Sequence, residues 1–253
     1  MKLPWILASL LGLALSAAAS GTPLRAAGTL QLEAPFLGKY AHVACPAGTP
    51  ASTACISISA DAAVPGLGQA RETYTLFWDQ SNPDCWHSTW TPTVITVAGK
   101  GELDASLRDP NACDEKDVSV ETTTDFTITG GSGAYAGATG GGTIRSRASE
   151  TGFTGDTWSG SLEVAGAEFD TAPPVISGAV SRVIRARRGV RRVRVTYAVQ
   201  AQDAVDGAVA VTCYPRSGSR FPTGRTIVTC SATDSSANTA RAKFRVTVRR
   251  GGG

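Results

Sequence analysis

Apolar and polar residues alternate over much of the chain, with the period of two that is typical of β-strands. The clearest alternating segments are Thr73–Trp78, Thr93–Val97, Glu102–Arg108, Asp125–Thr129 and Thr157–Val164. No segment has a convincing helical period, and Gly-rich turns separate the short strands. The pattern therefore predicts an all-β protein made of sandwiches or barrels.

The first residues follow a different pattern. Lys2 precedes an apolar stretch from Leu3 to Leu15, and the small residues Ala17 to Ala19 come next. This order predicts a signal peptide over residues 1–19. A membrane anchor is the alternative, but the stretch is short, and no later apolar run reaches the roughly 18 residues that a span needs. We expect a secreted, extracellular product without a transmembrane segment.

A proline pair divides the rest of the chain. Pro173 and Pro174 follow Asp170-Thr171-Ala172, and paired prolines interrupt both helices and strand ladders. Residues 20–175 contain 8 Lys and Arg against 18 Asp and Glu, a net charge of −10, whereas residues 176–253 contain 15 against 3, a net of +12. We therefore expect two domains, 28–169 and 170–249, with a tail at 250–253. Such asymmetry suggests mutual docking or a basic surface kept for an anionic partner.

Six cysteines occur after the signal: Cys45, Cys55, Cys85, Cys113, Cys213 and Cys230. An even number in an exported chain indicates disulfides. A zinc site fits poorly, because no C-x2-C spacing occurs and only His42 and His87 could assist. Proximity and the domain boundary predict the pairs Cys45–Cys55 and Cys85–Cys113.

An ordered set of motifs covers the C-terminal part. Its pieces are Asp170–Ile176, Val195–Tyr197, Ala201–Gly207, Val211–Gly224, Val228–Asp234, Asn238 and Phe244–Val248. The set resembles the hyalin repeat, or HYR, domain. The resemblance implies an immunoglobulin-like β-sandwich used for adhesion and display, and it motivates a Cys213–Cys230 bond. Ala237 departs from the pattern, where the family commonly has glycine, so we expect a local adjustment of that turn.

A Gly-rich stretch marks the N-terminal part. Residues 127–140 read TITGGSGAYAGATG, which resembles a turn of the allene oxide cyclase and dirigent barrel proteins. The resemblance implies a small antiparallel β-barrel, with a hairpin and bulge at its rim. A phosphate loop is excluded because the trailing Lys-Ser/Thr and a following helix are absent. Barrels of this kind can enclose an apolar ligand.

Arginines crowd one region of the basic part: Arg185, Arg187, Arg188, Arg191, Arg192 and Arg194. Alternation points Arg192 and Arg194 outward, opposite Val193 and Val195. The face either is solvated and blunts a strand edge, or binds an extracellular or cell-surface polyanion or glycan. If the face binds a polyanion, we expect the acidic barrel to compete with that partner by contacting the same surface. Nucleic acid fits less well, because no aromatic residues interleave for base stacking.

Three tryptophans, Trp78, Trp86 and Trp90, surround Cys85. They either stack a sugar ligand or fill the barrel core and brace the Cys85 loop.

Catalysis has little support in the sequence. None of the barrel family's catalytic residues can be matched, and Glu72, Glu102 and His87, which could transfer protons, are expected at the surface. We predict no catalytic residue, metal or cofactor. The favoured function is a secreted, non-enzymatic binding or adhesion protein, with the barrel displayed by the hyalin repeat. The alternative is a cyclase-like barrel enzyme acting on a small apolar ligand, with the repeat as a targeting module.

Overall fold

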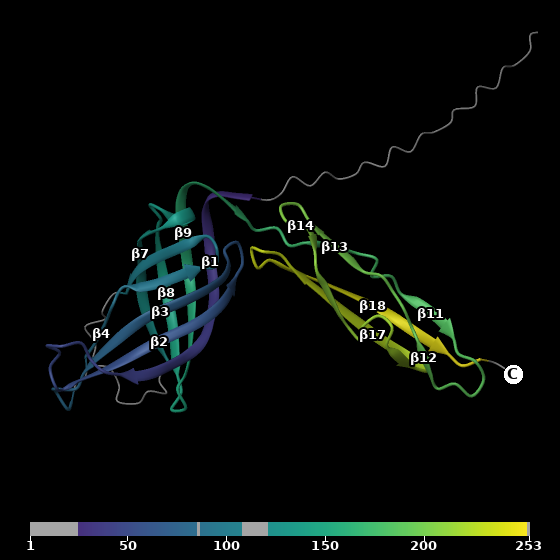
Figure 1. The fold of residues 1–253 in the computed structure, drawn as a ribbon, viewed down its shortest axis with the longest axis horizontal. Coiled ribbons are helices and arrows are strands. Elements are labelled where there is room, and N and C mark those ends of the chain that lie inside the picture. Colours follow the sequence, from purple (N-terminus) through teal and green to yellow (C-terminus); the bar gives the residue numbers. More distant parts are fainter. Residues whose placement is uncertain (1–24, 85–86, 108–120, 252–253) are drawn as a thin grey trace, which may run out of the picture.

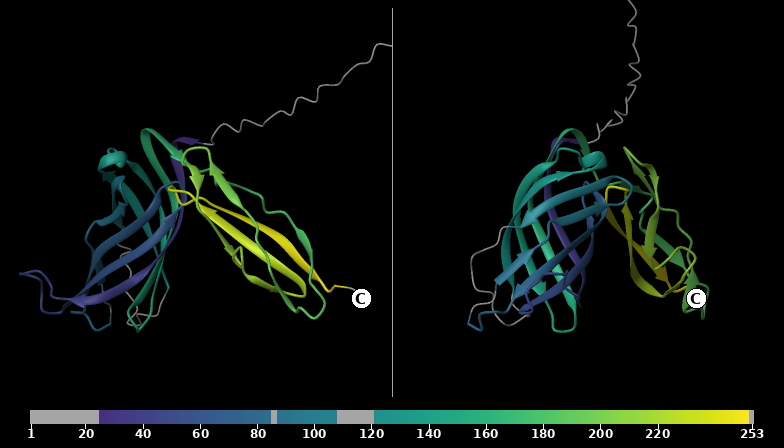
Figure 2. Two further views of the ribbon diagram at one scale, coloured as in Figure 1. Left: turned by 45° about the vertical axis from the view of Figure 1, so that its right-hand side comes forward. Right: turned by 60° about the vertical axis from the view of Figure 1, so that its left-hand side comes forward.

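The computed structural model describes residues 25–84, 87–107 and 121–251. They form two β domains that meet at one end and diverge from there (Figures 1 and 2). The predicted signal peptide, the predicted Cys85–Cys113 pair and Trp86 lie outside the described residues.

The N-terminal domain is a closed antiparallel barrel of eight strands. Its strands are β1 (Arg25–Val43), β2 (Thr53–Val64), β3 (Gly68–Asp79), β5 (Thr93–Val97), β6 (Gly101–Leu107), β7 (Thr122–Gly131), β8 (Thr139–Ala148) and β9 (Phe153–Asp170). Neighbours pair in the order β2-β1-β9-β8-β7-β6-β5-β3, and a β2–β3 ladder closes the ring. A short strand, β4 (His87–Trp90), adds to the free part of β3. The expected antiparallel barrel is confirmed.

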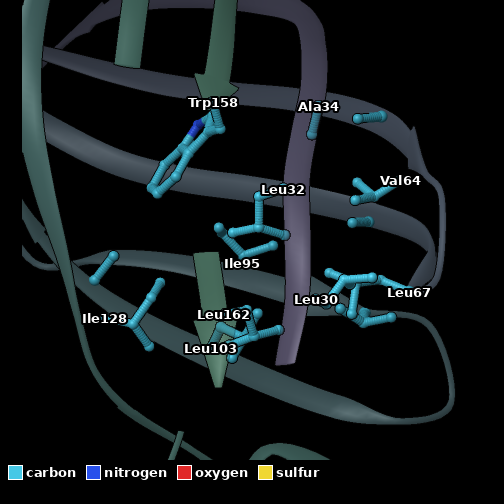
Figure 3. Close-up of a cluster of buried hydrophobic side chains, with 14 of the residues drawn as sticks. Leu30, Leu32, Ala34, Val64, Leu67, Ile95, Leu103, Ile128, Trp158 and Leu162 are labelled. Carbon is cyan, nitrogen blue, oxygen red and sulfur yellow. The ribbon is translucent and has the colours of Figure 1, made fainter. Parts of the chain in front are cut away.

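Alternating side chains of these strands fill the barrel. Leu30, Leu32, Ala34 and Phe36 of β1 are all at most 5% exposed. They meet inward residues of the opposite wall, and Figure 3 shows Leu32 and Ile95 beside Trp158. The barrel therefore holds a packed core of side chains.

The Gly-rich stretch lies at one end of the barrel, as expected. The β6–β7 ladder shifts register between Asp104 and Ala105, and the short 3-10 helix η1 (Gly133–Tyr135) follows β7. Gly140 has φ +144°, and a Cβ there would lie 2.1 Å from the Ser161 oxygen. Only glycine meets both conditions, which explains why this segment is rich in it.

The C-terminal domain has the layered sheets of an immunoglobulin-like sandwich. Its strands are β10 (Val175–Ser177), β11 (Arg182–Arg185), β12 (Arg192–Arg194), β13 (Gln200–Asp203), β14 (Gly207–Val209), β15 (Val211–Tyr214), β16 (Arg220–Pro222), β17 (Gly224–Thr233) and β18 (Thr239–Arg249). They form sheets β10-β13-β14, β11-β18-β17-β15 and β12-β16. The core contains Val228, Phe244 and Val246, with the Cys213–Cys230 disulfide beside them. That disulfide is confirmed.

Loops from both domains form the junction. The Gly66 N–H of the β2–β3 turn donates to the Ser236 carbonyl at 2.8 Å. Asn238 Nδ2 donates to the carbonyl of Asp170, the last residue of β9, at 2.9 Å. In the same loop Ala237 has φ +64°, a conformation that favours glycine. The β17–β18 turn therefore rests on the barrel.

Candidate functional site

Five arginines line a hollow at the end of the sandwich that points away from the barrel. They are Arg185, Arg187, Arg192, Arg194 and Arg220, and the hollow has a volume of about 580 Å³. Ala186, Val190 and Val193 complete its wall. Figure 1 shows β11 and β12 near the C-terminus, whereas β13 and β14 lie by the barrel. We call this hollow the arginine groove.

Local alternation builds the groove. Val195 and Phe221 are at most 2% exposed, which anchors β12 and β16 to the core. Their neighbours Arg192, Arg194 and Arg220 are consequently exposed. The confirmed outward direction of Arg192 and Arg194 thus follows from the sequence pattern.

Two of the arginines oppose each other directly. Arg194 pairs with Arg220 in the β12–β16 ladder, so both side chains leave the same face. Like charges at opposed positions destabilise a sheet. Arg194 is also held in place, since its Nε donates to the Gly218 carbonyl at 3.0 Å.

Among the described residues, no acidic side chain pairs with a groove arginine. Within the described part of the chain, the ion pairs involve Arg71, Arg145 and Arg147 of the barrel, and none involves a groove arginine. The three acidic residues that follow residue 175, Asp203, Asp206 and Asp234, gather elsewhere. An unneutralised group of guanidinium ions is suited to bind phosphate, sulfate or carboxylate groups.

The sequence identified most of this site. Of the six arginines expected to form a basic surface, Arg185, Arg187, Arg192 and Arg194 line the groove. Arg188 and Arg191 are exposed nearby without lining it. Arg220 was missed, although its place beside the apolar Phe221 in an alternating segment was a usable signal.

The domain contacts seen in the structure do not bring the acidic barrel to the groove, and the expected competition stays a prediction. Competition requires contact, because exposed charges interact over only about 8–10 Å at physiological salt. The contacts between the domains instead involve the 234–238 loop, at the opposite end from β12. The groove is therefore open to an external partner.

The barrel contains a polar cluster at its centre. Glu72 is 0% and Asp156 is 1% exposed. Trp158 Nε1 donates to Glu72 Oε2 at 2.6 Å, and the Tyr74 hydroxyl donates to Asp156 Oδ2 at 3.0 Å. The surface location expected for Glu72 is wrong, whereas Glu102 and His87 are exposed as expected. Glu72 alternates with Tyr74, Leu76 and Trp78 on one face of β3. This spacing was the feature of the sequence that indicated an inward position.

Burial dominates the acid–base properties of this cluster. It raises the pKa of Glu72 well above the usual range, and the charge of Asp156 raises it further. The pKa of Tyr74 is also raised, by burial first and then by the two carboxyls. Glu72 Oε1 and Asp156 Oδ1 are both buried without a hydrogen-bond partner. Burial therefore favours the protonated, uncharged form of Glu72.

The aromatic residues near Cys85 were given two interpretations. Trp78 is 8% exposed and packs with Ile56 and Ile58 in a second apolar cluster. Trp90 is half-buried opposite Leu76. For Trp78 this packing favours the core role. The Cys45–Cys55 disulfide, which staples the preceding loop to β2, is confirmed.

Comparison with known families bears on the sandwich. Residues 169–248 match the family model of the HYR domain, so the resemblance seen in the motifs is confirmed. The match indicates an extracellular module of the adhesion type. A comparison with curated proteins gave no match. Among the described residues, no helix has the length and apolarity to cross a membrane.

Proposed function

We propose that the protein is a secreted, non-enzymatic binding protein of the adhesion type, and that its HYR domain binds an anionic polymer in the arginine groove. The observation that carries this function is the set of five groove arginines without an acidic partner in the described structure. The disulfides and the HYR match support an extracellular location.

A polymer suits the groove better than a single small anion. The arginines come from β11, the loop after it, β12 and β16, so their guanidinium groups border an open hollow from several directions. Each can meet a different charged group of one chain, and a guanidinium contacts sulfate, phosphate or carboxylate through two parallel hydrogen bonds. The opposed Arg194 and Arg220 gain most, because a bound anion relieves their repulsion.

The barrel supports a display role more than a catalytic one. An enzyme needs a titratable group that a substrate can reach. Glu72 and Asp156 are sealed in the core by Trp158 and its neighbours. Their burial speaks against the cyclase-like alternative, because a substrate cannot reach these two carboxyls in the described lumen.

Binding of the full chain to immobilised dextran sulfate, measured over a salt series, tests the proposal. We expect affinity to fall steeply with salt, as it does when a polyanion releases counterions. The variant Arg187→Glu, Arg192→Glu, Arg220→Glu should lose at least tenfold in affinity. Arg194 is left intact in this variant because its hydrogen bond to Gly218 supports the loop.

A matched control separates the groove from net charge. The variant Arg216→Glu, Arg241→Glu, Lys243→Glu changes the charge equally at exposed positions outside the groove, and should keep most of the affinity. Equal losses in both variants, or binding that ignores salt, would overturn the proposal. The arginines would then be a solvated face that protects strand edges from aggregation.

A further inference from the structure

Four aspartates from separate segments meet at the junction of the domains. Asp170 ends β9, Asp203 ends β13, Asp206 lies in the β13–β14 turn and Asp234 follows β17. One carboxylate oxygen from each lies within 4.8 Å of the others. The fold thus concentrates four acidic groups in a space the size of a single ion's coordination shell.

The cluster is buried and lacks a cationic partner among the described side chains. Asp170, Asp203 and Asp234 are 5–8% exposed, and Asp206 faces solvent. Their hydrogen-bond donors are neutral, for example the Ser235 hydroxyl to Asp206 and the Asn238 amide to Asp234. Carboxylates kept this close without compensation are unfavourable.

One carboxylate oxygen of this cluster has no hydrogen-bond partner. Asp170 is 7% exposed, and its Oδ1 accepts the Ala172 N–H at 3.1 Å. Its Oδ2 is fully buried without a donor. A buried carboxylate oxygen without a donor is rare in folded proteins. This oxygen belongs to Asp170, the residue of the cluster that ends barrel strand β9. A metal ion would satisfy it.

We propose that Asp170, Asp203, Asp206 and Asp234 form a calcium site. Calcium takes six to eight oxygen ligands at about 2.3–2.6 Å, so opposite ligands lie about 4.6–5.2 Å apart. Carboxylates gathered within 4.8 Å fit that shell. Magnesium suits them less, because it keeps most of its water and binds few protein carboxylates.

The ion would fasten one domain to the other. Asp170 ends the last barrel strand, whereas Asp203 ends β13 of the sandwich, and Asp206 and Asp234 lie in its loops. The loop that carries Asp234 also contacts the barrel through Ser236 and Gly66. Calcium would therefore fix the angle between barrel and sandwich, at the opposite end of the sandwich from the arginine groove. This inference does not depend on polyanion binding.

Calcium binding to the full chain, freed of metal by a chelator, tests the site. Titration calorimetry with CaCl2 at constant ionic strength should give one site, with a Kd of about 10⁻⁴–10⁻³ M as in extracellular modules. MgCl2 should bind at least tenfold more weakly. Asp206→Asn, at the exposed ligand, should weaken calcium binding at least tenfold, while Asp84→Asn, an exposed aspartate of the barrel, should leave it unchanged.

Thermal unfolding distinguishes a metal site from a purely structural cluster. In 10 mM calcium the HYR transition of the parent chain should rise by about 5–20 °C. Asp206→Asn should lose this rise yet match or exceed the parent in chelator, because it removes repulsion. No calcium effect on the parent chain, or a variant that is less stable in chelator and still responds to calcium, would overturn the site.

Discussion

The barrel and the HYR domain place their charged groups in opposite ways. The barrel closes on itself and buries a carboxyl pair, Glu72 and Asp156, inside a packed core. The sandwich instead brings aspartates together at the junction and five of its arginines into the groove at the far end. Polar chemistry buried in a filled barrel serves the fold, whereas uncompensated charge on an open sandwich is available to a ligand.

The largest effect should come from removing the centre of the barrel. Trp158 is 1% exposed, lies 4.6 Å from the Phe126 ring and hydrogen-bonds Glu72. We expect Trp158→Ala to reduce the free energy of barrel unfolding by about 3–5 kcal/mol, with little change in dextran sulfate affinity. Urea unfolding followed by circular dichroism measures the first quantity. Phe153→Ala, at a 58% exposed aromatic on the same strand, is the control and should cost less than about 1 kcal/mol. A loss of dextran sulfate affinity in Trp158→Ala would show that the stability of the barrel and binding in the groove depend on each other.

The second effect concerns the smaller core of the sandwich. The Cys213–Cys230 bond spans 17 residues, so replacing both cysteines by alanine should cost about 3 kcal/mol in the HYR transition. The tryptophans precede residue 170, and their fluorescence therefore reports the barrel alone. We expect the circular dichroism transition of the HYR domain to shift while the fluorescence transition stays. A shift of the fluorescence transition by the same amount would mean that the two domains unfold together.

The sequence predicted these two regions unequally well, for physical reasons. Alternation and turn residues are local, so the strands, the sandwich motifs and the outward direction of Arg192 were accessible. The closed barrel was predicted only through a resemblance that covers fourteen residues. The pairing of β2 with β3, which closes the ring, cannot be inferred from composition. Glu72 was misplaced because a charged residue is rarely buried, even though its phase pointed inward.

The junction cluster could not be predicted from spacing. Asp170 and Asp203 are 33 residues apart, and Asp234 is a further 31 along the chain. Only the folded loops bring their oxygens within 4.8 Å. By itself each aspartate is an ordinary turn residue, so no local pattern predicts that it binds a metal.

The third effect tests whether the carboxyl pair is part of the core. Glu72 has a pKa raised by burial, so in the folded state it binds a proton that the unfolded chain has released. Barrel stability should therefore fall as pH rises above about 4.5, by up to about 1.4 kcal/mol per unit, until the folded pKa is reached. Glu72→Gln keeps the acceptor for Trp158 and carries no charge. It should flatten this slope and be about 1–2 kcal/mol more stable than the parent at pH 8. The exposed Glu102→Gln is the control, and identical slopes for parent and Glu72→Gln would contradict the buried proton.

The smallest effect is the influence of the barrel on the groove. If the barrel's net negative charge acted on the arginines, a fragment of residues 169–253 would bind dextran sulfate more tightly than the full chain. The contacts between the domains lie at the junction, whereas β12 is at the far end of the sandwich. Screening beyond about 8–10 Å removes the remaining attraction. We therefore expect the two affinities at 150 mM salt to agree within about twofold, and to separate only at low salt, where the screening length grows to about 30 Å. The full chain with Glu33→Gln and Glu163→Gln, two exposed barrel acids, repeats the comparison without cutting the chain. Tighter binding by the fragment at 150 mM salt would mean that the barrel reaches the groove in solution, and the separation of charge that distinguishes the two domains would then be a regulatory contact.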